Sequence, residues 1–212
     1  MDKVHRFIKN AHRVDYIKIL IHIKYIPKYI IRTYIRRNPH KYFEIGFIYQ
    51  YYYKNYERMY EYYNKAIDDA NILVHLGLYY ENIENDYDKM KEYYLKAVEL
   101  GNADAMHYLG TYYEFYNYDL MKKYYLDAIA LGNSESMFNL GHYYFTLVNF
   151  DLIKIYYNMA IELGHAYAMY HLGSYYYYYE QNYELMKHYY MFAIKLNFTR
   201  IYNIIKIDLY YA

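Results

Sequence analysis

Apolar residues recur along the chain at helical spacing. In residues 106–113 they fall at i, i+3, i+4 and i+7, which is one face of an α-helix, and a matching face follows in residues 121–129. The two faces consist of Met106, Leu109, Gly110 and Tyr113 in the first segment and Met121, Tyr124, Tyr125, Ala128 and Ile129 in the second. This pattern predicts two helices that pack against each other.

The helix pair is one unit of a repeat with a period of 31 to 33 residues. Each unit has a glycine after Leu or Ile, a tyrosine three residues later, then a Tyr-Tyr pair and an alanine. The glycines are Gly46, Gly77, Gly110, Gly141 and Gly173, and the alanines are Ala66, Ala97, Ala128, Ala160 and Ala193. Small residues there should let the paired backbones approach closely, which offsets the helix-propensity penalty of glycine, about 1 kcal/mol. Five such units predict an all-α array.

Polar residues and glycines mark where these helices begin and end. Between the two helices of each unit, Asn or Asp can cap the second helix, and the acidic residue that follows favours its positive N-terminal end. The expected caps are Asn55, Asp86, Asn117, Asn149 and Asn182. After the second helix, Gly101, Gly132 and Gly164 supply the left-handed residue that helix C-termini often use.

These anchors resemble the tetratricopeptide repeat, a helix-turn-helix unit of about 34 residues. The alanines after Gly-Asn or Gly-His, in "LGNADAM" and "LGHAYAM", resemble the related Sel-one-like repeat. Met or Ile replaces the alanine usual early in the second helix, and the usual proline after that helix is absent. The resemblance implies a right-handed α-α superhelix whose first helices line a concave, peptide-binding face.

The repeats divide the chain into three parts. Residues 40–198 hold the five units, residues 1–39 form a basic helical cap or degenerate repeat, and residues 199–212 form a C-terminal capping helix. Such caps cover the open apolar faces of a repeat array. The alternation of Ile17, Ile19, Ile21 and Ile23 is strand-like and is the main evidence against a helical N-terminal cap.

Composition narrows the class of protein. The chain has 212 residues, 57% of them hydrophobic, with 42 tyrosines and no cysteine. The absence of cysteine excludes disulfides and thiolate metal sites and fits a reducing compartment, so we expect an intracellular, cytoplasmic protein. The abundance of Tyr, Ile and Asn is typical of an AT-rich genome. Charged residues interrupt the apolar stretch 16–35, which argues against a membrane span.

No motif for catalysis or for a cofactor occurs in the sequence. A phosphate-binding loop, a nucleotide fingerprint, H-E-x-x-H and G-x-S-x-G are all missing. His107 and His142 could approach each other in adjacent units, but two ligands without a third make a weak metal site. We therefore expect no enzyme activity, no cofactor and no metal.

The concave face is the candidate site for a protein or peptide partner. The resemblance to tetratricopeptide repeats implies that it is lined by the residues three before, one after and four after each glycine. These are Phe43, Phe47 and Gln50; Val74, Leu78 and Glu81; His107, Thr111 and Glu114; Phe138, His142 and Phe145; and Tyr170, Ser174 and Tyr177. The lining is aromatic at both ends and acidic in the middle, which favours a helix or extended peptide with apolar anchors and some positive charge.

An alternative function is nucleic-acid or anionic-surface binding through the basic N-terminal segment. Through Pro39 the chain has ten Lys and Arg against Asp2 and Asp15, whereas the remainder has 14 Lys and Arg against 21 Asp and Glu. Tyrosines could stack on bases. However, the tyrosine-rich repeats are the acidic part, so we assign their repeat-locked rings to core packing and expect the other tyrosines at the surface.

Overall fold

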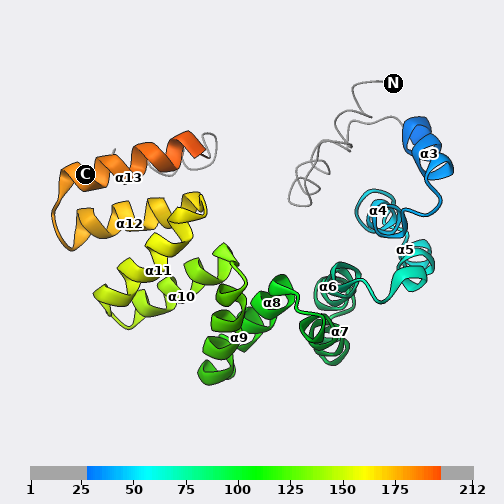
Figure 1. The fold of residues 1–212 in the computed structure, drawn as a ribbon, viewed down its shortest axis with the longest axis horizontal. Helices are drawn as coiled ribbons and strands as arrows, with labels where there is room; N and C mark the ends of the chain where they lie inside the picture. Colours follow the sequence, from blue (N-terminus) through cyan, green and yellow to red (C-terminus); the bar gives the residue numbers. More distant parts are fainter. Residues whose placement is uncertain (1–27, 197–212) are drawn as a thin grey trace.

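A computed structural model describes residues 28–196 of the chain as a curved array of helices (Figure 1). No strand occurs in this described part, so the predicted all-α class is confirmed. Consecutive helices pack against each other, and α4, α6 and α8 lie on the inside of the arc (Figure 1). The helices are α3 (Lys28–Arg37), α4 (Tyr42–Ile48), α5 (Tyr56–Tyr63), α6 (Ala70–Tyr79), α7 (Tyr87–Glu99), α8 (Ala103–Tyr113), α9 (Tyr118–Ala130), α10 (Ser134–Thr146), α11 (Phe150–Glu162), α12 (Ala166–Tyr178) and α13 (Tyr183–Leu196).

The predicted caps form as expected. The side chains of all five predicted N-cap residues accept a backbone N–H from the first turn of the second helix, as Asn55 does from Arg58 at 2.9 Å. Gly101, Gly132 and Gly164 have φ of 74°, 81° and 78°, the left-handed conformation predicted after these helices. Asp69 caps α6 by accepting the backbone N–H of Asn71 at 2.9 Å. The repeat boundaries therefore follow from local sequence.

The recurring Leu-Gly pattern is explained by a tyrosine ring that packs on the glycine more than by close contact between two backbones. In each repeat the second tyrosine of the Tyr-Tyr pair is buried, and its ring lies directly over the glycine of the first helix. A Cβ added at Gly77 would lie 2.3 Å from the Tyr94 ring, and at Gly141 it would lie 2.7 Å from Tyr157. The glycine therefore makes room for an aromatic ring, which corrects the expectation that it mainly lets two backbones meet.

The first tyrosine of each pair stacks on the tyrosine three residues after the glycine. The ring centroids are 5.4 to 5.7 Å apart, and the planes are nearly parallel. The stacked pairs are Tyr49–Tyr62, Tyr80–Tyr93, Tyr113–Tyr124, Tyr144–Tyr156 and Tyr176–Tyr189. Offset stacking of this kind adds about 0.5–1.5 kcal/mol to what the buried area contributes. Each helix pair is thus joined by two tyrosine contacts.

The repeats also depart from strict regularity. α4 and α6 each end in a π-helical turn, Tyr49–Tyr53 and Tyr80–Glu84, which lengthens the connection to the second helix. The second helix of the first repeat ends in a 3-10 turn, so Ala66 is half-buried whereas Ala97 is fully buried. Val148 has φ of 55°, a conformation that a β-branched residue rarely adopts.

Several expectations fall on residues that the structure does not describe. The C-terminal capping helix 199–212 and the strand-like alternation at 17–23 lie outside the described residues. Of the N-terminal cap, α3 is described, and it begins directly after Pro27. None of the described helices combines the length and the apolar character that crossing a membrane requires.

Candidate functional site

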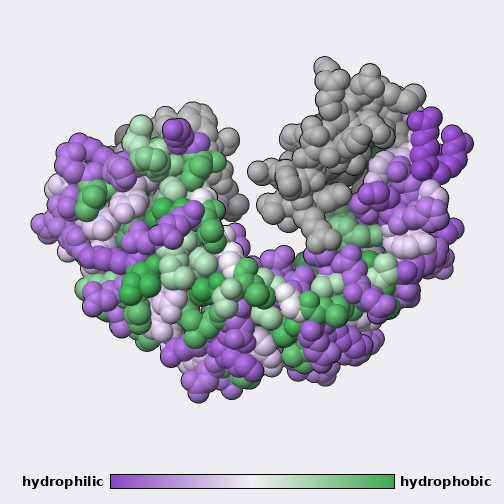
Figure 2. Space-filling view, in the orientation of Figure 1, coloured by the Kyte–Doolittle hydropathy of each residue, from purple (hydrophilic) through white to green (hydrophobic). Residues whose placement is uncertain are grey.

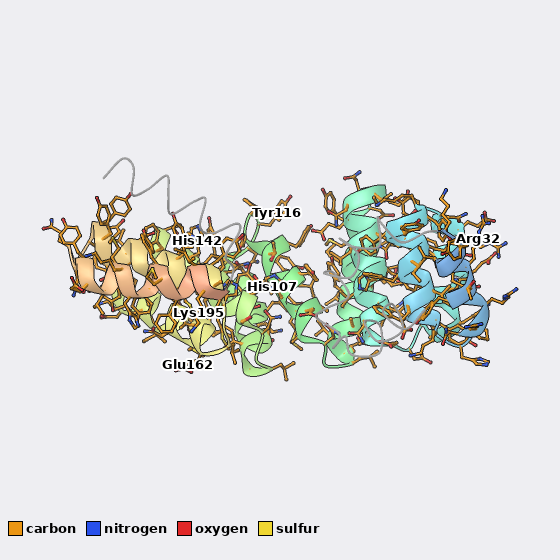
Figure 3. The ribbon with its side chains drawn as sticks, turned by 90° about the horizontal axis from the view of Figure 1, so that it is seen from above. Arg32, His107, Tyr116, His142, Glu162 and Lys195 are labelled. Atoms are coloured by element: carbon orange, nitrogen blue, oxygen red, sulfur yellow. The ribbon has the colours of Figure 1, made fainter. Side chains whose placement is uncertain are left out.

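The inner side of the arc is formed by the first helices of the repeats. Figure 3 looks into this side, and His107 and His142 lie along its middle, whereas Tyr116 and Glu162 mark opposite edges. Side chains on neighbouring first helices contact one another there. His107 of α8 hydrogen-bonds Ser136 of α10, with 3.0 Å between Nδ1 and Oγ. This face is therefore a continuous surface across repeats.

Buried tyrosine hydroxyls reach this face through the glycine gaps. The Tyr94 hydroxyl donates to Glu81 at 2.8 Å, and the Tyr125 hydroxyl donates to Glu114 at 2.5 Å. In the first repeat the Tyr63 hydroxyl donates to Gln50 at 2.9 Å. Burial is the main cause that raises the pKa of Tyr94 and Tyr125 far above the usual value, so both stay protonated donors. Tyrosine hydroxyls of the second helix thus hold in place the acceptor side chains that belong to the first helix.

Sequence analysis assigned these tyrosine rings to core packing and missed the network that their hydroxyls form. A signal for it existed: the residue four after the glycine is Gln or Glu in the first three repeats. The last repeat uses the residue one after the glycine instead, with 2.9 Å between Ser174 Oγ and the Tyr190 hydroxyl. In the third repeat, Thr111 also lies 3.2 Å from the Tyr125 hydroxyl.

The fourth repeat lacks such an acceptor. Phe145 occupies the position of Glu114, and the Tyr157 hydroxyl is buried without a hydrogen-bond partner. Phe138 stacks on Tyr157 with 5.8 Å between ring centroids. This repeat therefore presents aromatic rings to the inner face where its neighbours present hydrogen-bonded polar groups.

Replacing Tyr157 by phenylalanine should stabilise the protein, because it removes a buried hydroxyl that has no partner. We expect a gain of about 1 kcal/mol, and a loss of about 1 kcal/mol for Tyr94→Phe, which breaks the bond to Glu81. Urea denaturation of both variants checks this. Equal losses in the two variants would show that the Tyr157 hydroxyl is satisfied in solution.

Histidines gather on the same face. His142 lies beside His171 of the next repeat, with 5.8 Å between ring centroids, so its histidine neighbour is His171 instead of the predicted His107. Burial, followed by the charges of His142 and His165, lowers the pKa of His171 to about 4. His165 caps α12 by accepting the Ala168 N–H at Nδ1, which leaves Nε2 as the donor to Glu135 at 3.2 Å. Within the described residues, no group of three His, Asp or Glu side chains could hold a metal ion.

Three carboxylates lie near Tyr108 of α8. Burial, and after it the charges of Asp104, Glu81 and Glu135, raise the pKa of Tyr108 to about 12. These three carboxylates and Glu114 form no ion pair with Lys or Arg in residues 28–196. Their hydrogen bonds come from tyrosine, asparagine and histidine donors. Glu114 lies at the opposite end of α8 from Asp104, so these four carboxylates extend along the helix. We call Glu81, Asp104, Glu114 and Glu135 together the acidic centre.

The predicted lining residues differ in how far they are accessible. Phe47 and Val74 are buried in the helix packing and offer almost no surface, because neighbouring first helices cover them. His142 is exposed. Gln50 is also buried, and the others are half-buried: Phe43, Leu78, Glu81, His107, Thr111, Glu114, Phe138, Phe145, Tyr170, Ser174 and Tyr177.

The aromatic lining residues also contribute to packing. Phe43, Phe138 and Tyr170, each three residues before the glycine, stack on the buried tyrosines of their own repeats. Residues two before the glycine, among them His75, Asn139 and His171, also lie at this face and were missed, although helical spacing places them beside the predicted positions.

The tyrosines outside the repeat-locked positions divide between interior and surface. In the run from Tyr175 to Tyr179, Tyr175 is buried and hydrogen-bonded to Glu180, whereas Tyr178 is 63% exposed. Tyr116 is 72% exposed at one edge of the array (Figure 3). In Figure 2 the outer rim of the arc is largely hydrophilic, and hydrophobic residues show along its middle.

By sequence, the chain matches no protein-family profile and no curated protein. Solved structures match it well. A Sel1 repeat protein from Oxalobacter formigenes is 23% identical, with 76% of this chain and 74% of that chain covered and a TM-score of 0.61. A protective antigen of uropathogenic Escherichia coli with an SLR fold is 21% identical with a TM-score of 0.61; the match covers 75% of this chain and 39% of the antigen.

A third match extends over nearly the whole of the other protein. MamA is 20% identical, with 72% of this chain and 94% of that chain covered and a TM-score of 0.52. Identities at this level show the fold. Together with the period, the caps and the consecutive packing of the helices, they show that the chain has the right-handed α-α superhelical fold of the tetratricopeptide and Sel-one-like repeat proteins.

Proposed function

We propose that the protein is a non-enzymatic, intracellular adaptor that binds a partner's helix or extended peptide along its inner face. Repeat proteins of this fold support a role in protein interaction. The observation that carries the finer proposal is the acidic centre, whose four carboxylates have no Lys or Arg partner in the described chain. A peptide with Lys or Arg would supply the missing charge.

The geometry around the acidic centre supports a selective contact. Tyr94 and Tyr125 hold Glu81 and Glu114 in place from below, so these carboxylates lose little further freedom when a ligand binds. Aromatic rings lie on either side along the array, with Phe43 at one end and Phe138 and Tyr170 towards the other. We expect apolar side chains of the peptide to contact these rings and its cations to contact the acidic centre.

Removing the negative charges of Glu81 and Glu114, the two carboxylates that accept tyrosine hydroxyls, should weaken this binding without unfolding the protein. In a peptide-display selection against the full-length protein, we expect sequences that combine Lys or Arg with aliphatic or aromatic residues. The Glu81→Gln/Glu114→Gln variant should bind the selected peptides at least about tenfold more weakly, or about 1.4 kcal/mol, by calorimetry. The fold should survive, because Gln50 already accepts the equivalent tyrosine hydroxyl in the first repeat.

The matched control removes two carboxylate charges elsewhere on the protein. Glu99 and Glu162 are exposed near the ends of α7 and α11, so Glu99→Gln/Glu162→Gln should leave the affinity within about twofold. A third variant, Phe138→Ala, tests an aromatic contact, and circular dichroism monitors the loss of its stacking on Tyr157. Selection of acidic peptides, or equal affinity of the Glu81→Gln/Glu114→Gln variant and the control, would contradict the proposal.

A further inference from the structure

A pocket between α3 and the first repeat is lined by three arginines. Its volume is about 400 Å³, and it lies where α3, the π-helical turn after α4 and the start of α5 meet. Arg32 and Arg36 come from α3, and Arg58 comes from the first turn of α5. Figure 3 shows Arg32 at one end of the described array, far from His142 on the inner face. We call this site the arginine pocket.

The arginine pocket carries uncompensated positive charge. Arg58 pairs with Glu61 at 2.8 Å, so one of the three charges has a partner. Neither Arg32 nor Arg36 forms an ion pair with a carboxylate among the described residues. The lining contains no acidic residue. Two guanidinium charges therefore face the pocket without a counter-charge from the described chain.

Helix electrostatics alone does not explain these arginines. Arg36 lies in the last turn of α3, where a positive charge is favourable. Arg32 lies in the middle of that helix, and Arg58 lies in the first turn of α5, where a positive charge opposes the helix dipole. Three arginines from two helices converge on one concavity even though one of them stands at an unfavourable position. That arrangement indicates a ligand.

Neutral donors complete the lining. Asn55 caps α5 through its carbonyl oxygen, which leaves its amide N–H₂ as a donor. Tyr53 lines the pocket with a buried hydroxyl that lies beside the Arg32 guanidinium. Burial raises the pKa of Tyr53 and the neighbouring charge of Arg32 opposes this rise, which places Arg32 close to the hydroxyl. Tyr49 stacks on Tyr62 and forms a fixed wall.

We propose that the arginine pocket binds the phosphate monoester of a phosphorylated partner protein. A phosphate monoester carries a charge of about −1.5 to −2 at pH 7, which matches the two unpaired guanidinium groups. Its three terminal oxygens accept several hydrogen bonds at once, and planar guanidinium groups donate to them in pairs. A single carboxylate would leave about one of the two charges uncompensated.

The shape of the pocket and the charge of the repeats favour a protein as the carrier of the phosphate. Residues 40–212 have 14 Lys and Arg against 21 Asp and Glu, so an RNA that extended from the pocket over the repeats would be repelled, whereas the excess of basic residues lies in the segment through Pro39. A phosphorylated side chain places its charge at one point and avoids that repulsion. The pocket is a single concavity at one end of the array, which suits one phosphate group better than a row of phosphodiesters.

Calorimetric titration of the full-length protein at physiological salt tests this inference. The probes are inorganic phosphate, the peptide Ala-Ala-pSer-Ala-Ala, its Ser and Glu counterparts, and oligouridine RNA. We expect saturable binding of phosphate and of the phosphopeptide. Arg32→Gln/Arg36→Gln should weaken phosphopeptide binding at least about tenfold, because it removes both unpaired charges. The control Lys28→Gln/Arg37→Gln changes the same charge on the same helix outside the lining and should change binding less than about threefold.

Each remaining outcome contradicts the inference. Absence of saturable phosphate binding shows that the pocket is no anion site. Equal binding of the Glu peptide assigns the pocket to carboxylates. Tighter binding of RNA than of the phosphopeptide, lost in Arg32→Gln/Arg36→Gln, assigns it to nucleic acid. Equal weakening by the control shows a general charge effect, and circular dichroism and thermal melting establish that every variant is folded.

Discussion

Replacing Gly77 by alanine is expected to destabilise the protein by about 3 kcal/mol, the upper part of the range for overpacking a core. The new Cβ would lie 2.3 Å from the Tyr94 ring, and this ring is fully buried between two helices. Alanine is the better helix former by about 1 kcal/mol, so a helix governed by propensity alone would become more stable. The sign of the change therefore separates the two explanations. Urea denaturation followed by circular dichroism measures it.

Gly101→Ala is the matched control. Gly101 has φ of 74° and no atom within 4 Å of an added Cβ. Alanine there meets only the backbone cost of the left-handed conformation, about 1–2 kcal/mol. Gly77→Ala should thus cost clearly more than Gly101→Ala, although Gly77 lies in a regular helix. If the order is reversed, the glycine of the Leu-Gly pattern does not serve to accommodate the tyrosine ring.

Local signals in the sequence predicted the secondary structure well. Asn117 caps α9 and Gly132 ends the turn that follows it, because both effects depend on a few neighbouring residues. Tertiary relations were predicted less well. The glycine period was evident, but whether a backbone or a ring fills the gap depends on how the second helix is rotated about its axis. The π-helical turns after α4 and α6 had no sequence signal that we could identify.

The chemistry of the candidate site could not be predicted from helical phase. Helical phase predicts Glu81 and Glu114 on the inner face, and in the structure both accept hydrogen bonds from tyrosines of the second helix. The same phase could not show that tyrosines of the second helix reach through the array to bond these carboxylates, because that contact depends on side-chain length across two helices. Nor could it show that Phe47 is buried, since neighbouring repeats cover it and their offset depends on packing.

Only part of the arginine pocket could be predicted from the sequence. The excess of basic residues before Pro39 was visible, and it suggested an anionic ligand. Arg58, which also lines the pocket, lies in a segment whose sequence is typical of a helix start. Only the fold brings Arg58 next to Arg32. A charge count therefore indicates a class of ligand, whereas the site itself depends on residues from two helices.

Acid should destabilise the protein between about pH 6.5 and pH 4 through His75 and His171. Burial lowers the pKa of His75 to about 4, and burial with the charges of His142 and His165 lowers that of His171 to about 4. Both are neutral in the folded protein at pH 7. Below about pH 6.5 the unfolded chain takes up protons that the folded protein does not, which favours unfolding.

The stability that these histidines contribute is therefore fully present above about pH 6.5, decreases as the pH falls, and is lost near pH 4. Each group has a limiting slope of about 1.4 kcal/mol per pH unit within this window, so the two together should cost at least about 3 kcal/mol. Urea midpoints measured at several pH values test this. The carboxylates whose pKa is lowered, such as Glu135 and Glu180, titrate below their ordinary range and add their effect at the acidic end of the window.

His75→Gln/His171→Gln should flatten this profile, because glutamine keeps hydrogen-bonding capacity and does not titrate. His75 is enclosed by the rings of Phe43, Phe47 and Tyr51, and the Tyr51 hydroxyl lies 3.3 Å from its Nδ1, a contact that a neutral imidazole can accept. His188 is exposed on α13, so His188→Gln should leave the profile unchanged. A double variant with the same pH dependence as the unaltered protein would show that neither ring stays unprotonated in the fold, and that acid acts through the carboxylates alone.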